Sequence, residues 1–178
     1  LFLAPASALL PLLVHQEGGD AVRLGLAASA LGVGLLVGGV VLGVWGGFER
    51  GVVTALSSLI AMGLGVLALI AVPVGSPWFL LSLLFVGAAS ATVNGPIQAI
   101  VQATIAPDMQ GRVFALYGSL AAVAAPVGLA VAAPVAEWLG VASWYIAGGA
   151  VAILAGVIGL FTPSLLKLET TDPDAPAS

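Results

Sequence analysis

The sequence predicts an all-α, polytopic membrane protein: a bundle of six transmembrane helices. Of its 178 residues 61% are hydrophobic and only 7% are charged, and long apolar segments alternate with short polar ones. Ordinary soluble domains carry about 25% charged residues, so this chain cannot cover a water-facing surface. A membrane-spanning helix needs roughly 20 apolar residues, which leaves room for six spans. The strands of a membrane β-barrel would alternate in segments of about ten residues, and that pattern is missing.

The apolar segments give the helices in order. The first, residues 1–14, is shorter than a span, and we interpret it as a truncated helix. Further helices are expected over about 24–48, 52–72, 78–105, from the 106–112 turn to about 136, and over 145–161. The Pro-Val-Gly-Ser-Pro segment at 73–77 breaks the chain into three helices plus three, which predicts a 3+3 inverted repeat. The bundle then covers 1–166, and 167–178 forms a disordered tail.

The polar turn between the fourth and fifth helices is the most distinctive stretch. Pro107 cannot continue the preceding helix, and Asp108 suits the N-cap of the next one. Arg112 follows four residues later, where an ion pair with Asp108 is geometrically available. We predict that Asp108, Gly111 and Arg112 belong to a cytoplasmic loop. In that loop Arg112 acts either as a topology signal or as a conformational latch.

Four basic residues indicate the orientation of the chain. With six spans, Arg50, Arg112 and Lys167 fall on one side of the membrane and Arg23 falls on the other. The positive-inside rule places the three in the cytoplasm. The C-terminus is therefore expected to be cytoplasmic.

Small residues and prolines predict where helices pack or bend. Gly34 with Gly38, and Gly39 with Gly43, form two Gly-x-x-x-Gly pairs that let another helix approach closely. In the fifth helix Pro126 and Gly128 can bend the helix or loosen its packing.

A polar stripe runs along the fourth helix, where Asn94, Gln98 and Gln102 recur every four residues. An amide facing lipid costs several kcal/mol, so the stripe faces either protein or a water-filled cavity. As interhelical contacts, such amides contribute only about 0.6–2 kcal/mol each. We predict that Asn94 and Gln98 line a substrate cavity, with Gln102 at an interface.

Catalysis has no support in the sequence. Cysteine is absent, and no nucleophile–base pair, metal-ligand cluster or phosphate-binding loop of the required kind is present. We expect no enzyme activity, no cofactor and no metal. The net charge of −4 gives no reason to expect nucleic acid as a partner. No Asp, Glu, Lys, Arg or His lies deep within a predicted span, so a carboxylate that binds protons within the membrane would lie outside this chain.

Two segments carry a family resemblance: Gly-Val-Trp-Gly-Gly-Phe-Glu-Arg at 43–50 and Ala-Pro-Asp-Met-Gln-Gly-Arg-Val-Phe at 106–114. Together with Asn-Gly-Pro-Ile-Gln at 94–98 and Ala-Pro-Val-Gly at 125–128, they resemble the C-terminal half of bacterial major facilitator permeases. The nearest branch is that of macrolide-efflux and enterobactin-exporter-like proteins.

The resemblance implies helices seven to twelve of a twelve-helix transporter in the bacterial inner membrane. It implies the lipid bilayer, a missing N-terminal six-helix half and a small-molecule substrate as partners, with protons as a candidate coupling ion. In such a half the fourth helix lines the central cavity. Tyr117 and Ser119, one to two turns after Arg112, are expected to face the inner vestibule as further residues of the substrate cavity.

The predicted function is export of a small amphipathic molecule or drug by alternating access. Two alternatives are a non-transporting six-helix scaffold or assembly module, and a nutrient importer of the same fold.

Overall fold

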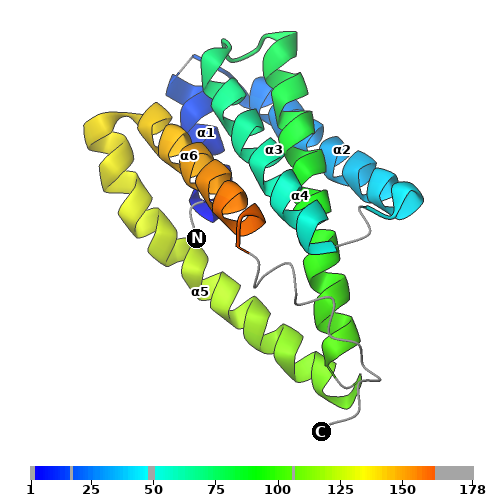
Figure 1. The fold of residues 1–178 in the computed structure, drawn as a ribbon. Helices are drawn as coiled ribbons and strands as arrows, with labels where there is room; N and C mark the ends of the chain where they lie inside the picture. Colours follow the sequence, from blue (N-terminus) through cyan, green and yellow to red (C-terminus); the bar gives the residue numbers. More distant parts are fainter. Residues whose placement is uncertain (1–2, 17, 48–50, 106, 163–178) are drawn as a thin grey trace, which may run out of the picture.

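The computed structural model of the chain describes residues 3–16, 18–47, 51–105 and 107–162. Every regular element in these ranges is a helix (Figure 1). The helices are α1 (Leu3–Gln16), α2 (Ala21–Trp45), α3 (Gly51–Ala71), α4 (Pro77–Thr104), α5 (Pro107–Leu139) and α6 (Val141–Leu160). The all-α fold class is thus confirmed. Arg50, Lys167 and the predicted tail at 167–178 lie outside the described residues.

Five of the described helices, α2 to α6, are long and apolar enough to cross a membrane. The 14 residues of α1 extend only about 21 Å, which is less than the roughly 30 Å of a hydrocarbon core. The structure therefore contains five full-length candidate spans and the short first helix that the sequence predicted. The 28 residues of α4 and the 33 of α5 reach about 42 and 50 Å, more than a span needs.

Local capping sets where α2 and α4 begin. The Asp20 carboxylate accepts a hydrogen bond from the backbone N–H of Arg23 at 2.9 Å, so α2 starts at Ala21 rather than near residue 24 as predicted. The Ser76 hydroxyl oxygen accepts from the N–H of Phe79 at 3.2 Å, and Pro77 occupies the first turn of α4. At the other end of α2, Gly46 has a φ of 75°, the left-handed conformation that ends many helices.

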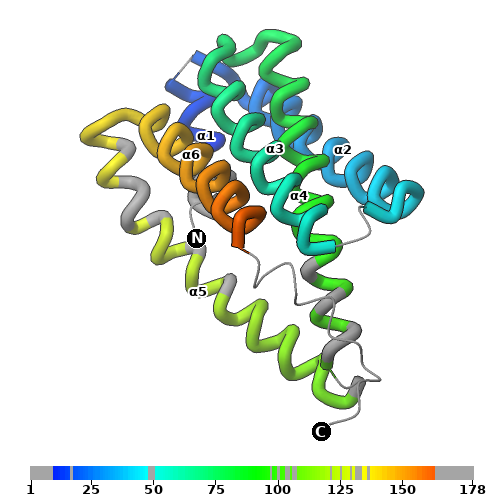
Figure 2. Tube along the Cα trace, viewed as in Figure 1, coloured from blue at the N-terminus to red at the C-terminus, as the bar shows by residue number. Residues whose placement is uncertain are grey.

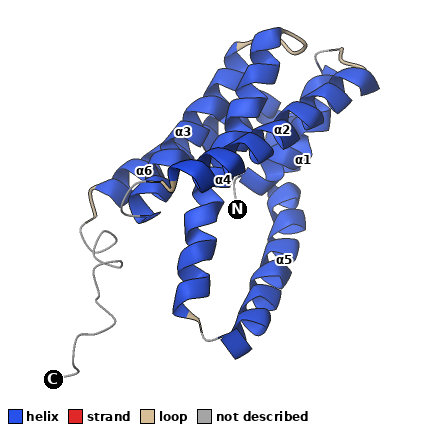
Figure 3. Cartoon of the chain, turned by 90° about the vertical axis from the view of Figure 1, so that its right-hand side faces the viewer, coloured by secondary structure: helices blue, strands red, loops and turns tan. Residues whose placement is uncertain are grey.

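Helix α4 lies between α2 and α3 and packs extensively on both, and α3 in turn packs on α6 (Figure 2). The core brings together buried side chains of α1, α4 and α6, including Val14, Leu83 and Tyr145. Helix α5 diverges from α4 after the turn that joins them, and it contacts α6 and α1 (Figure 3). Most of the α5 side chains remain exposed, among them Leu120 and Val123 at 63% each.

Glycine determines how closely α2 and α4 approach. A Cβ added at Gly34 would overlap the backbone carbonyl of Leu84, and one added at Gly38 would overlap that of Ala88. The contact is reciprocal, because a Cβ at Gly87 would overlap the carbonyl of Leu31. The two backbones therefore touch, as Gly-x-x-x-Gly pairs allow.

The second predicted glycine pair lies on another face of α2. No described atom lies within 4 Å of a Cβ built at Gly39 or at Gly43. Within the described chain, no helix packs against these two residues. A role for them in packing remains a prediction that needs a partner from elsewhere.

Successive helices run in alternating directions, so the turns alternate between the two ends of the bundle (Figure 1). At one end the guanidinium of Arg23 lies beside Gly75, within 3.5 Å of a Cβ built there. The start of α2 and the α3–α4 turn therefore share this end. Arg112 lies near the α4–α5 turn at the opposite end.

Candidate functional site

The predicted amide stripe continues the side of α4 that faces the core. Phe79 and Leu83, which are 1% and 3% exposed, join the core that α1, α2, α3 and α6 also contribute to. Steps of three and four residues lead from Leu83 through Ser90 to Asn94, so these residues share one face of the helix. Asn94 is exposed where the packed core has ended. The inner face of α4 thus changes from buried and apolar to exposed and polar.

Hydrogen bonds position the first amide of the stripe. Nδ2 of Asn94 donates to the backbone carbonyl of Ser90 at 2.8 Å and lies 3.5 Å from the Ser90 hydroxyl oxygen. No described residue donates a hydrogen bond to the Asn94 side-chain oxygen. Gln98, one turn further on, is also exposed. Both side chains can accept hydrogen bonds from a ligand or from water.

The two predicted vestibule residues on α5 do not form a pair. Tyr117 and Ser119 are both exposed, and the Ser119 hydroxyl donates to the carbonyl of Ala115 at 2.8 Å. Residues two apart on a helix point in directions about 200° apart, so only one of the two can face α4. Since α5 diverges from α4 (Figure 3), this chain by itself does not place Tyr117 or Ser119 next to Asn94.

A residue that the sequence analysis overlooked joins α4 to α5. The Gln110 Nε2 donates to the backbone carbonyls of Gln102, at 2.9 Å, and Ile105, at 3.0 Å. The last carbonyls of a helix have no partner within it, and the Gln110 amide supplies one across the turn. Gln102 therefore takes part in the contact between α4 and α5 through its backbone carbonyl. In the sequence, the signal for this contact was an amide side chain three residues after the helix-breaking Pro107.

The predicted cytoplasmic loop is helical from its second residue. Helix α5 begins at Pro107, because proline suits the first helical position. Asp108 consequently lies inside the first turn, where its charge favours the positive end of the helix, and the expectation that it caps the helix was wrong. Asp108 and Arg112 are exposed, and this described part of the chain contains no ion pair between them. Nothing lies within 4 Å of a Cβ at Gly111.

The predicted bending residues lie in the middle of α5. The helix continues through both Pro126 and Pro134 to Leu139. Pro126 is exposed and Gly128 is buried. A role for Pro126 and Gly128 in bending or packing remains a prediction.

Comparison with known proteins supports the family suggested by the sequence. The family model described as Major Facilitator Superfamily matches residues 2–178. Macrolide efflux protein A of Streptococcus pyogenes is 27% identical over 167 residues, covering 93% of this chain and 41% of the relative. The multidrug efflux pump Tap of Mycolicibacterium fortuitum is 31% identical over 173 residues, covering 95% of this chain and 41% of the pump. No solved structure gives a significant match.

The chain thus spans about two fifths of the length of these relatives. The family match extends over nearly every residue of the chain, and it agrees with the apolar helices that the structure describes. The protein is a multi-pass membrane protein and belongs to the major facilitator superfamily.

Proposed function

We propose that the chain is the C-terminal six-helix half of a secondary transporter that exports a small amphipathic molecule by alternating access. The observation that carries this proposal is the exposed amide stripe on the core-facing side of α4, within a chain of this family. The names of the relatives, macrolide efflux protein and multidrug efflux pump, support the direction of transport. The protein acts through binding and conformational change rather than through catalysis.

In this proposal a second half of the transporter covers the exposed side of α5 and the free face of α2. Asn94 and Gln98 then lie at the interface of the two halves, where substrates of such transporters bind. Their amides offer hydrogen bonds to the polar part of the substrate, and the surrounding helices offer apolar contact. One half rocks against the other and exposes the amides to each side of the membrane in turn. Arg112, near the α4–α5 turn, is the proposed latch residue of this motion.

Cysteine accessibility tests the amide stripe. In the intact transporter, freed of any other cysteines, we expect Asn94→Cys and Gln98→Cys to react with a membrane-impermeant thiol reagent, because both positions face a water-filled cavity. Substrate should slow the reaction at both positions. The measurement is the rate of labelling with and without the transported drug.

Thr92→Cys is the matched control, since Thr92 lies about 200° around α4 from Asn94. Thr92 is only half-buried, but its surroundings are apolar, so this thiol should stay unlabelled. If the cysteines at 94 and 98 were as unreactive as the one at 92, the stripe would be a helix-packing device and not part of a cavity. Reaction at all three positions without protection by substrate would argue against the proposal in the same way.

The proposed orientation places the C-terminus in the cytoplasm of a bacterial inner-membrane protein. A phosphatase that is active only outside the cytoplasm should be silent when fused after Ser178. It should be active when inserted in the polar segment before α2, next to Asp20. The prediction combines the opposite ends of the bundle at which α2 begins and the α4–α5 turn lies (Figure 1) with the positive-inside rule, in which Arg112, Arg50 and Lys167 outweigh Arg23. The opposite pattern of activity would reverse the proposed topology.

A further inference from the structure

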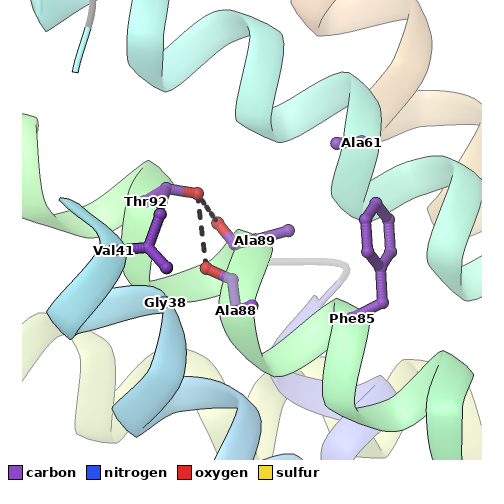
Figure 4. Close-up of a pocket in the computed structure, with 7 residues that line it drawn as sticks. All are labelled: Gly38, Val41, Ala61, Phe85, Ala88, Ala89 and Thr92. Carbon is purple, nitrogen blue, oxygen red and sulfur yellow. Dashed lines mark hydrogen bonds between the residues drawn. The ribbon is translucent and has the colours of Figure 1, made fainter. Parts of the chain in front are cut away.

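An apolar groove runs along the outer side of α4, between α2 and α3. Its volume is about 180 Å³, and it is lined by Gly38 and Val41 of α2, Ala61 of α3, and Phe85, Ala88, Ala89 and Thr92 of α4 (Figure 4). The floor consists of small side chains. At the rim, Val41 and Phe85 are 49% and 48% exposed. The groove is therefore open to whatever surrounds the helices.

The only polar group among the lining side chains needs no partner from an occupant. The Thr92 hydroxyl lies 2.9 Å from the carbonyl oxygen of Ala89 and 3.3 Å from that of Ala88, and it donates within its own helix (Figure 4). An occupant consequently meets hydrocarbon alone. Apolar cavities of about 150 Å³ stay free of water and bind benzene-sized guests, so a groove of about 180 Å³ suits a short length of hydrocarbon.

The groove lies within the thickness of the membrane. At 1.5 Å per residue, Phe85 and Thr92 are about 12 and 22 Å along α4 from its start. Gly38 is about 25 Å along α2 from the same end of the bundle. A hydrocarbon core is about 30 Å thick, so each of these depths falls among the acyl chains.

The groove faces away from the interior of the bundle. Phe85 and Thr92 lie about 180–200° around α4 from Leu83, which is buried in the core with α1 and α6. The groove is open at its rim, where Val41 and Phe85 are about half exposed. Its mouth is continuous with exposed apolar side chains of membrane-spanning helices. The bilayer surface of the protein therefore extends into the groove.

We propose that this groove is a lipid-binding site that takes one acyl chain of a bilayer phospholipid. The chain lies along α4 over Ala88, Ala89 and Thr92, with the ring of Phe85 at its side. The small side chains of the floor allow it to lie closer to the helix axis than the lipids around the rest of the protein. The site is separate from the proposed substrate cavity, which lies on the opposite side of α4.

Photolabelling tests the site. The intact transporter is placed in vesicles of phosphatidylethanolamine and phosphatidylglycerol that contain a phospholipid with a diazirine in the middle of one acyl chain. We expect labelling of Val41, Phe85 and Thr92 to exceed that of Leu154 and Ile158 on the exposed side of α6 by about five-fold. Ala61→Leu fills the groove and should reduce the excess to the level at α6. Thr92→Val preserves the shape and should retain the labelling.

Equal labelling of the groove and of α6 in the wild-type protein, unchanged by Ala61→Leu, would reduce the groove to ordinary lipid-facing surface. Absence of label from the groove would mean that a protein side chain fills it, which also overturns the proposal. The ratio of groove labelling to α6 labelling in the wild-type protein tests the proposed lipid site even if Ala61→Leu fails to fold. Lipid labelling of Asn94 would contradict the proposed substrate cavity, whatever the result at Phe85.

Discussion

Replacing Gly38 with leucine is expected to prevent α2 and α4 from packing and to remove most of the folded protein from the membrane. Even a Cβ at this position overlaps the backbone carbonyl of Ala88, and a backbone cannot move aside as a side chain can. Overpacking typically costs about 1–3 kcal/mol and sometimes more, and the upper end applies to a backbone contact. We expect at least about a ten-fold loss of protein that elutes as a single species in detergent.

The neighbouring residue supplies the control. Gly39→Leu makes the same chemical change in the same helix, but no described atom lies within 4 Å of a Cβ at Gly39. This variant should fold in normal amounts, and any defect it has should appear in transport, where the proposed second half would contact α2. Similar losses for the two variants would mean that leucine disturbs α2 itself rather than its contact with α4.

Replacing Gln110 with glutamate is expected to impair transport while leaving insertion normal. The Gln110 amide donates to the carbonyls of Gln102 and Ile105. A carboxylate has no hydrogen to donate and repels both oxygens. Each neutral hydrogen bond contributes about 0.5–1.5 kcal/mol, so losing two and adding repulsion destabilises the turn by about 2 kcal/mol or more. We expect transport to fall about ten-fold and protease cleavage near residue 105 to accelerate.

Two other variants test whether the turn depends on hydrogen bonds to the backbone carbonyls or on glutamine side chains as such. Gln110→Lys retains a donor and places a cation beside the C-terminal carbonyls of α4, a gain that the positive N-terminal end of α5 partly offsets, so most transport should remain. Gln102→Ala keeps the backbone carbonyl that accepts from Gln110, and the turn should resist protease as in the wild type. If Gln110→Glu transported normally, the α4–α5 connection would not depend on this amide.

The positions of the helices could be predicted because apolar segments of this length have few alternatives. Helix α6 begins at Val141, about four residues before its predicted start and without a side-chain cap, whereas two other starts differ for a reason visible in the sequence. Asp20 caps α2, which begins at Ala21 rather than near residue 24, and Pro107 starts α5 one residue before the predicted cap at Asp108. Both shifts follow from local chemistry that the sequence displays.

The pairing of the helices could not be predicted in the same way. The two glycine pairs of α2 look alike in the sequence, and only the position of α4 distinguishes the buried Gly38 from the open Gly39. The position of Gln110 after Pro107 was a signal in the sequence, but the carbonyls that its amide contacts depend on the angle at which α5 leaves α4. The amide stripe was found because a helical spacing is visible in the sequence. Whether it lines a cavity depends also on residues beyond this chain.

The sparse packing of α5 has a consequence for biogenesis. Among the five candidate spans it is both the least apolar and the least buried. It also carries Pro126 and Pro134 in its interior. The bilayer therefore stabilises α5 less than it stabilises α2 or α3. Helices α2, α3 and α4 can pack on one another as soon as all three are in the membrane. During synthesis α5 therefore depends on surfaces other than α2, α3 and α4, namely α1, α6 and the proposed N-terminal half.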